Sequence, residues 1–132
     1  MADDVWNAAS RGEAAEVRRL IDRGGDVHYK DASGWTPLWI ASYKGHEAVV
    51  KTLLAAKAQV DAKAADGSTP LYVASQKGHE ATVKTLLAAK AQVDAKAANG
   101  CTPLYIASCN GHEATVKTLL AAKAQEIGRA HV

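Results

Sequence analysis

Apolar positions along the chain follow a pattern that returns about every 33 residues. Within one period, residues 38–41 form a short apolar stretch, and Val50, Leu53 and Leu54 follow at spacings of three and four. Spacings of this kind place side chains on one face of a helix. Each period is therefore predicted to contain a short helix and then a second helix with one buried face.

Residues at the ends of these segments carry helix start and stop signals. Thr36 can act as an N-cap, and Pro37 suits the first helical position, where proline loses no hydrogen bond. Gly45 permits a tight turn, after which the second helix is predicted over about residues 47–57. Residues 59–67 then form a turn or hairpin that leads into the next period.

The repeat is also visible as motifs. Gly-x-Thr-Pro-Leu begins at Gly34, Gly67 and Gly100, and Gly-His-Glu begins at Gly45, Gly78 and Gly111. Residues 57–89 and 90–122 differ at only five of 33 positions. Such self-similarity is the signature of a repeat architecture. The predicted units are 1–33 (a diverged N-terminal capping unit), 34–66, 67–99, an incomplete unit 100–125, and a separate tail 126–132.

These motifs resemble the ankyrin repeat family, whose pattern is Gly-x-Thr-Pro-Leu-His-x-Ala-Ala-x-x-Gly-His followed by a Val-x-x-Leu-Leu helix. The resemblance covers about residues 3–125. It implies an all-α solenoid of stacked helix-turn-helix units, with hairpin fingers projecting from one side.

Three positions depart from the family pattern. The histidine after Thr-Pro-Leu is aromatic here, the second alanine is serine, and the glycine after the second helix is lysine. Trp39 can only donate a hydrogen bond where the family's histidine bonds backbone. A left-handed lysine would cost about 1 kcal/mol. In unit order the residues are Trp39, Tyr72 and Tyr105; Ser42, Ser75 and Ser108; and Lys57, Lys90 and Lys123.

The tail does not continue the repeat. Residues 127–132 can be back-translated as ATC GGA AGA GCA CAC GTC, which matches a common short-read sequencing adapter beginning AGATCGGAAGAGC. We therefore expect residues 126–132 to be adapter read-through in a chain that naturally continues with more repeats. An ordinary chain terminus is the alternative, and the source nucleotide read distinguishes the two.

The two ends of the repeat array differ in polarity. A solenoid needs terminal units with a polar outer face. The last unit repeats the interior sequence over 113–122, and nothing in the tail resembles a capping helix. We expect an exposed apolar edge there and self-association through it. The first unit, by contrast, carries Arg11, Glu13, Glu16, Arg18, Arg19, Asp22 and Arg23.

Composition narrows the function classes. Only 5% of residues are aromatic and there is no Phe, so thin layers of closely packed helices are expected. A net charge of +2 lacks the concentrated positive field of a nucleic-acid binder. No apolar run suits a membrane span, and the acidic start does not suit a signal peptide. Two cysteines do not make a disulfide framework, so the cytoplasm or the nucleus is expected.

Differences between the copies mark a candidate binding surface. Four of the five differences between residues 57–89 and 90–122 fall at the finger tip or at the end of the first helix, while the second helix is identical between residues 79–89 and 112–122. Diversification for binding explains this distribution, and neutral drift at exposed positions is the alternative. The predicted partner-binding residues are Ser33, Trp35, Tyr43, Lys44, Asp66, Ser68, Gln76, Lys77, Asn99, Cys101, Cys109 and Asn110.

Metal binding and catalysis find little support. His46, His79 and His112 occur once per unit, and units about 10 Å apart cannot share a zinc ion. We expect these histidines to cap the second helix. Cys101 and Cys109 lie about 12 Å apart along a helix, beyond disulfide reach. No catalytic residue, metal or cofactor is predicted.

The favoured interpretation is a non-enzymatic module that binds another protein through its concave face and finger tips. Two alternatives remain open. One is an accessory segment of a larger enzyme, such as a kinase or a ubiquitin ligase. The other is a passive spacer without a ligand.

Overall fold

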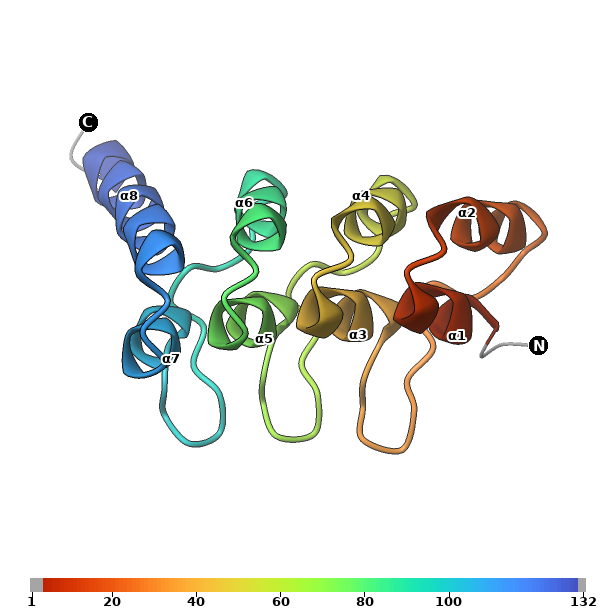
Figure 1. The fold of residues 1–132 in the computed structure, drawn as a ribbon, viewed down its shortest axis with the longest axis horizontal. Coiled ribbons are helices and arrows are strands. Elements are labelled where there is room, and N and C mark those ends of the chain that lie inside the picture. The colour runs from red at the N-terminus through yellow and green to blue at the C-terminus, as the bar shows by residue number, and fades with distance from the viewer. Residues whose placement is uncertain (1–3, 131–132) are drawn as a thin grey trace.

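The computed structural model describes residues 4–130, in which helices form two layers and no strand occurs (Figure 1). One row holds α1, α3, α5 and α7, and the other holds α2, α4, α6 and α8. Successive helices of a row contact one another, so each unit stacks on the next. The helices are α1 (Asp4–Arg11), α2 (Ala14–Asp22), α3 (Pro37–Lys44), α4 (Glu47–Ala55), α5 (Pro70–Gln76), α6 (Glu80–Ala88), α7 (Pro103–Cys109) and α8 (Glu113–Ala130).

The inner helices begin as predicted. The Thr36 hydroxyl accepts a hydrogen bond from the Trp39 backbone N–H at 3.0 Å, and Pro37 is the first helical residue. Thr69 and Thr102 cap α5 and α7 in the same way. The cap satisfies one of the backbone donors that a helix start leaves unpaired. The helical repeat architecture is confirmed.

The connections after α4 and α6 each contain a left-handed lysine. Lys57 and Lys90 hold φ values of 71° and 72° after α4 and α6. Lys123 occupies the equivalent position but lies inside α8, so it is not left-handed. The six residues before each lysine are identical, and the sequence after Lys123 departs from the other two only from residue 126.

The core is a thin layer of small aliphatic side chains between the two rows. Leu53, Leu86 and Leu119 of the outer row are fully buried, as are Leu38 and Leu71 of the inner row. Alanines between them allow the helices to approach closely. No thick core forms, as the low aromatic content predicts.

Two serines in this layer lack hydrogen-bond partners. Ser42 and Ser75 replace the second alanine of the motif, and both are fully buried. Neither hydroxyl has a partner among the described residues. A buried hydroxyl without a partner loses its hydration and gains nothing in return.

The histidines join neighbouring units and do not cap helices. His46 and His79 occupy N-cap positions, but their side chains make no cap hydrogen bond. Instead, Nε2 of His79 lies 3.0 Å from the carbonyl oxygen of Tyr43 in the preceding unit. His46 and His112 reach Ser10 and Gln76 in the same way. The predicted capping role is wrong, because a nearby carbonyl of the previous unit is the better partner.

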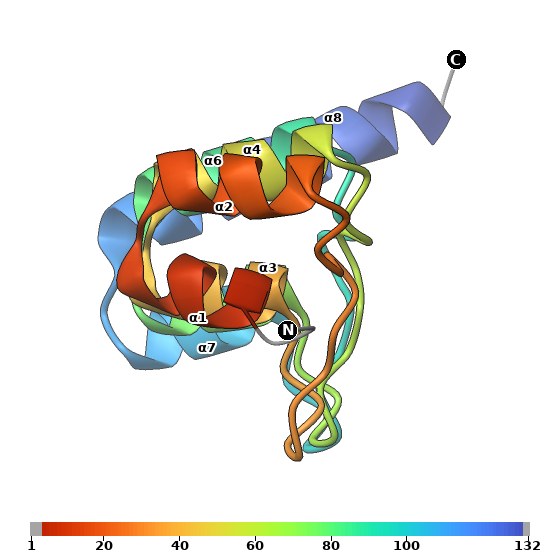
Figure 2. The ribbon, with the colours of Figure 1, turned by 90° about the vertical axis from the view of Figure 1, so that its right-hand side faces the viewer.

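Hairpin fingers connect the units and are joined to one another (Figure 2). The Ala65 N–H donates to the Ser33 carbonyl at 3.0 Å, and the Ala98 N–H donates to the Asp66 carbonyl at 2.9 Å. The tips are therefore not independent loops. Their relative positions are fixed by backbone hydrogen bonds.

The tail continues α8 as far as residue 130, so this helix does not end near Lys123 as the second helix of the repeat is predicted to do. Figure 2 shows the last turns of α8 extending past the ends of α2, α4 and α6. These turns leave the apolar edge uncovered, since Leu120 and Ile127 are 50% and 48% exposed. Residues 1–3 of the capping unit and 131–132 of the tail lie outside the described residues.

None of the helices within residues 4–130 has both the length and the apolar character needed to cross a membrane.

Candidate interaction surface

Three aromatic rings form a stacked column along α3. Trp39 and Tyr43 lie four residues apart on one side of the helix, and Trp35 lies directly before the N-cap Thr36. The ring centroids of Trp35 and Trp39 lie 4.4 Å apart with planes 8° from parallel. Those of Trp39 and Tyr43 lie 5.4 Å apart at 9°. Trp39 is buried, while the outer two rings are half-buried and offer surface to a partner.

A chain of hydrogen bonds links this column to the second finger. The Trp39 indole N–H donates to the Ser68 hydroxyl at 3.0 Å, and that hydroxyl donates to Asp66 Oδ1 at 2.6 Å. The Ser68 backbone N–H donates to the same oxygen at 3.0 Å. These bonds from Ser68 favour the charged form and lower the pKa of Asp66. The finger thus carries a fixed carboxylate beside the rings.

A cation lies at the other end of the column. Lys77 Nζ is 4.9 Å from the centroid of the Tyr43 ring, within the range of a cation–π contact. The residues at the position of Lys77 in the neighbouring units, Lys44 and Asn110, make hydrogen bonds to the preceding unit instead. Lys44 donates to both oxygens of Ser10 at 2.8 and 3.2 Å, and Asn110 donates to the Gln76 carbonyl at 3.0 Å.

The structure gathers six of the predicted residues around one hollow of about 430 Å³. We call it the aromatic hollow. It lies between the second and third units. The three rings of the column and residues of the second finger line it. The predicted residues that line it with available surface are Trp35, Tyr43, Asp66, Gln76 and Asn99.

Other predicted residues lie elsewhere or offer little surface. Ser68 also borders the hollow, but it is only 1% exposed, so its role is to position Asp66. Lys44 is drawn toward the first unit. Ser33 is exposed on the first finger. Cys101, Cys109 and Asn110 belong to the last unit, where Cys101 is half-buried and Cys109 is exposed.

Sequence reasoning missed three residues of this region. Trp39 and Tyr72 line the hollow although both were considered only as departures from the family's histidine. Trp6 was not considered, yet its indole N–H donates to the Trp35 carbonyl at 3.0 Å. The spacing of Trp39 and Tyr43 was the available signal, since residues four apart face the same side of a helix.

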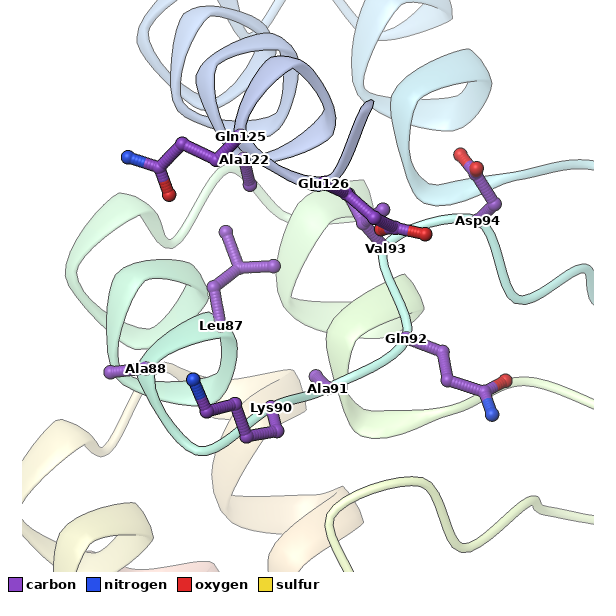
Figure 3. Close-up of a pocket in the computed structure, with 10 residues that line it drawn as sticks. All are labelled: Leu87, Ala88, Lys90, Ala91, Gln92, Val93, Asp94, Ala122, Gln125 and Glu126. Atoms are coloured by element: carbon purple, nitrogen blue, oxygen red, sulfur yellow. The ribbon is translucent and has the colours of Figure 1, made fainter. Parts of the chain in front are cut away.

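A larger hollow of about 630 Å³ lies where α8 departs from the stack (Figure 3). Leu87 of α6 points toward Ala122 of α8, and Val93 and Glu126 also line the hollow. Its lining contains no histidine, cysteine, serine or threonine. Its ionisable lining residues are Lys90, Asp94 and Glu126.

Metal chemistry is not supported within residues 4–130. This part of the chain has no group of three or more histidine, cysteine or acidic side chains placed to hold an ion. Cys101 and Cys109 are free thiols. The surface at the aromatic column presents aromatic rings, the Asp66 carboxylate and the Lys77 ammonium group. These groups suit the binding of a partner.

Comparison with protein families gives one match. The model described as ankyrin repeats, in three copies, matches residues 5–64 and 58–130. A search of curated proteins finds no significant match to the chain.

Proposed function

Since the chain belongs to the ankyrin repeat family, whose repeats are generally non-catalytic modules for protein interaction, we propose that it binds another protein through its concave face and finger tips. The proposed contacts are the exposed or half-exposed members of the predicted set. They are Ser33, Trp35, Tyr43, Lys44, Asp66, Gln76, Lys77, Asn99, Cys101, Cys109 and Asn110.

One observation carries this proposal. The outer helices are copied without change over 79–89 and 112–122, whereas the inner helices and fingers differ between units. Trp35, Tyr43 and Asp66 are three residues that differ between units, and all three line the aromatic hollow. Tryptophan and tyrosine are enriched among the residues that dominate binding energy.

Rigidity supports the same proposal. The finger tips are fixed by the backbone hydrogen bonds of Ala65 and Ala98. His79 and His112, which lie directly before α6 and α8, hydrogen-bond to carbonyls of α3 and α5 in the preceding units. A surface held in this way loses little conformational entropy when a partner binds.

The test is affinity capture with the wild type, Trp35→Ala and Tyr43→Ala, followed by quantitative mass spectrometry. Lys84→Ala, an exposed change on α6, is the matched control. We expect specific partners to be lost with both aromatic variants and retained with the control. Identical partner lists for all four proteins would instead favour a passive spacer.

An accessory role in a larger enzyme is compatible with the same binding surface. Recovery of the full-length transcript separates the two possibilities. A catalytic domain encoded in the same reading frame would support the accessory role.

We also propose self-association through the last unit. Tyr105 and Leu120 are exposed on the edge of the stack, where a further unit would otherwise lie. Sedimentation velocity tests this, with Leu120→Glu expected to shift the protein toward monomer. A wild type that is monomeric at all concentrations would contradict it.

A further inference from the structure

The aromatic column occurs in only one unit. Residues at the positions of Trp35, Trp39 and Tyr43 are Ser, Tyr and Gln in the third unit and Cys, Tyr and Cys in the fourth. The carboxylate beside it is equally singular, since Ser33 and Asn99 occupy the positions of Asp66 in the neighbouring fingers. The aromatic column and the Asp66 carboxylate are therefore both absent from the equivalent positions of the neighbouring units, and both lie at the aromatic hollow.

The Asp66 carboxylate has spare accepting capacity. Both hydrogen bonds from Ser68 end on Oδ1. Oδ2 accepts none from any other residue that the structure describes. The serine hydroxyl holds the carboxylate in place, and the buried Trp39 indole holds the serine. A fixed carboxylate with a free oxygen suits a charged donor from a partner.

The aromatic column already accepts one cation of the chain itself. Lys77 lies over the Tyr43 ring at the end of the column away from the finger. At the finger end, Trp35 is half-buried and lines the same hollow as Asp66. A group that occupies this end meets an aromatic surface and an anion together.

Resting on the proposed function, we propose that the aromatic hollow binds an arginine side chain of the partner. A guanidinium is planar, stacks on aromatic rings and carries charged N–H donors that suit the free Oδ2 of Asp66. Lysine provides a point charge without the planar stacking. Acidic side chains are repelled by Asp66, and purely apolar ones leave its carboxylate desolvated without a donor.

The test begins with selection from a display library of random peptides on the wild-type protein. We expect the peptides that compete for the hollow to be enriched in arginine over lysine. Affinities are then measured by fluorescence polarisation for an arginine peptide and for the same peptide with citrulline, a neutral isostere. Citrulline is expected to bind about tenfold or more weakly, as loss of a charge-assisted hydrogen bond implies.

Asp66→Asn provides the second half of a double-mutant cycle. Asparagine already occupies the equivalent position at Asn99, where its Oδ1 accepts the Cys101 N–H at 3.0 Å, so the finger is expected to keep its fold. In this variant, arginine and citrulline peptides should bind with nearly equal affinity. An equal citrulline penalty in the wild type and in Asp66→Asn would overturn the inference.

The outcomes separate this inference from the proposed function. Binders that lose affinity with Trp35→Ala but show no arginine enrichment would sink the arginine site and leave protein binding at this face standing. If no binder is sensitive to Trp35→Ala, both proposals fail. Lys84→Ala again serves as the control on the outer helix.

Discussion

The third and fourth units have almost the same sequence and very different surroundings. Residues 57–89 and 90–122 share all but five of 33 positions. Yet Tyr72 is 6% exposed and its copy Tyr105 is 57% exposed. A Cβ placed on Gly78 would lie 2.5 Å from His112, whereas at Gly111 nothing lies within 4 Å.

This difference shows that burial in the stack is supplied by the next unit. The third unit is covered on both sides, because α5 contacts α3 and α7, and α6 contacts α4 and α8. The fourth unit is covered on one side only. In a solenoid, stability is the sum of the units and of the interfaces between neighbours, so identical residues need not contribute equally.

The largest expected contrast concerns the leucine of Thr-Pro-Leu. Leu71 is fully buried, and its copy Leu104 is partly exposed. Leu71→Ala is expected to lower the free energy of unfolding by about 3 kcal/mol, and Leu104→Ala by about 1–2 kcal/mol. Urea unfolding followed by far-UV circular dichroism measures both. Equal losses of unfolding free energy in the two variants would contradict the claim that the next unit supplies the burial.

A smaller contrast of opposite sign is expected at the serines. The Ser75 hydroxyl is buried without a partner, whereas Ser108 is exposed and donates to the Leu104 carbonyl at 2.8 Å. Ser75→Ala should raise the free energy of unfolding by about 1 kcal/mol. Ser108→Ala, measured by the same unfolding experiment, controls for helix propensity and should change it by less than about 0.5 kcal/mol. A loss of stability in Ser75→Ala would mean that its hydroxyl is satisfied in solution.

The smallest contrast concerns the lysines after the second helix. Lys90 is left-handed, and Lys123 lies within α8 and pairs with Asp94. Lys90→Gly should raise the free energy of unfolding by about 0.5 kcal/mol, because glycine adopts positive φ without strain. Lys123→Gly should lower it, because glycine weakens a helix interior and the ion pair is lost. Thermal unfolding detects both signs, and two changes of the same sign would show that α8 ends near Lys123 in solution.

Much of the fold was predictable because its signals are local. Thr36 caps a helix with a donor three residues away, and Pro37 fixes the first helical residue. Gly45 takes the left-handed conformation that its turn requires. Each of these depends on residues within one turn of helix, and the repeat then multiplies each correct prediction.

The candidate site was predicted only in part. Trp35, Tyr43 and Asp66 were expected to face a partner, and the structure places them around one hollow. The sequence did not indicate that Ser68 would be buried between Trp39 and Asp66. That contact joins residues 29 positions apart, so it depends on how one unit seats on the next.

The histidines and the last helix were predicted wrongly for the same reason. The position of His79 before α6 suggests a cap, but its carbonyl partner, Tyr43, lies 36 residues earlier in the chain. The sequence around Lys123 matches that around Lys90, but the residues after Gln125 differ and the helix continues. In both cases the deciding contact or residue lies outside the local motif.

The sequence by itself determined the length of the unit, the starts of its inner helices and the turns between them, since hydrogen bonds and backbone preferences over a few residues fix these. The tertiary structure decided which copies of a residue are buried, and that one carboxylate, one ammonium group and three rings share a surface. These depend on contacts between units, and two copies of one sequence differ in them according to the neighbours that they have.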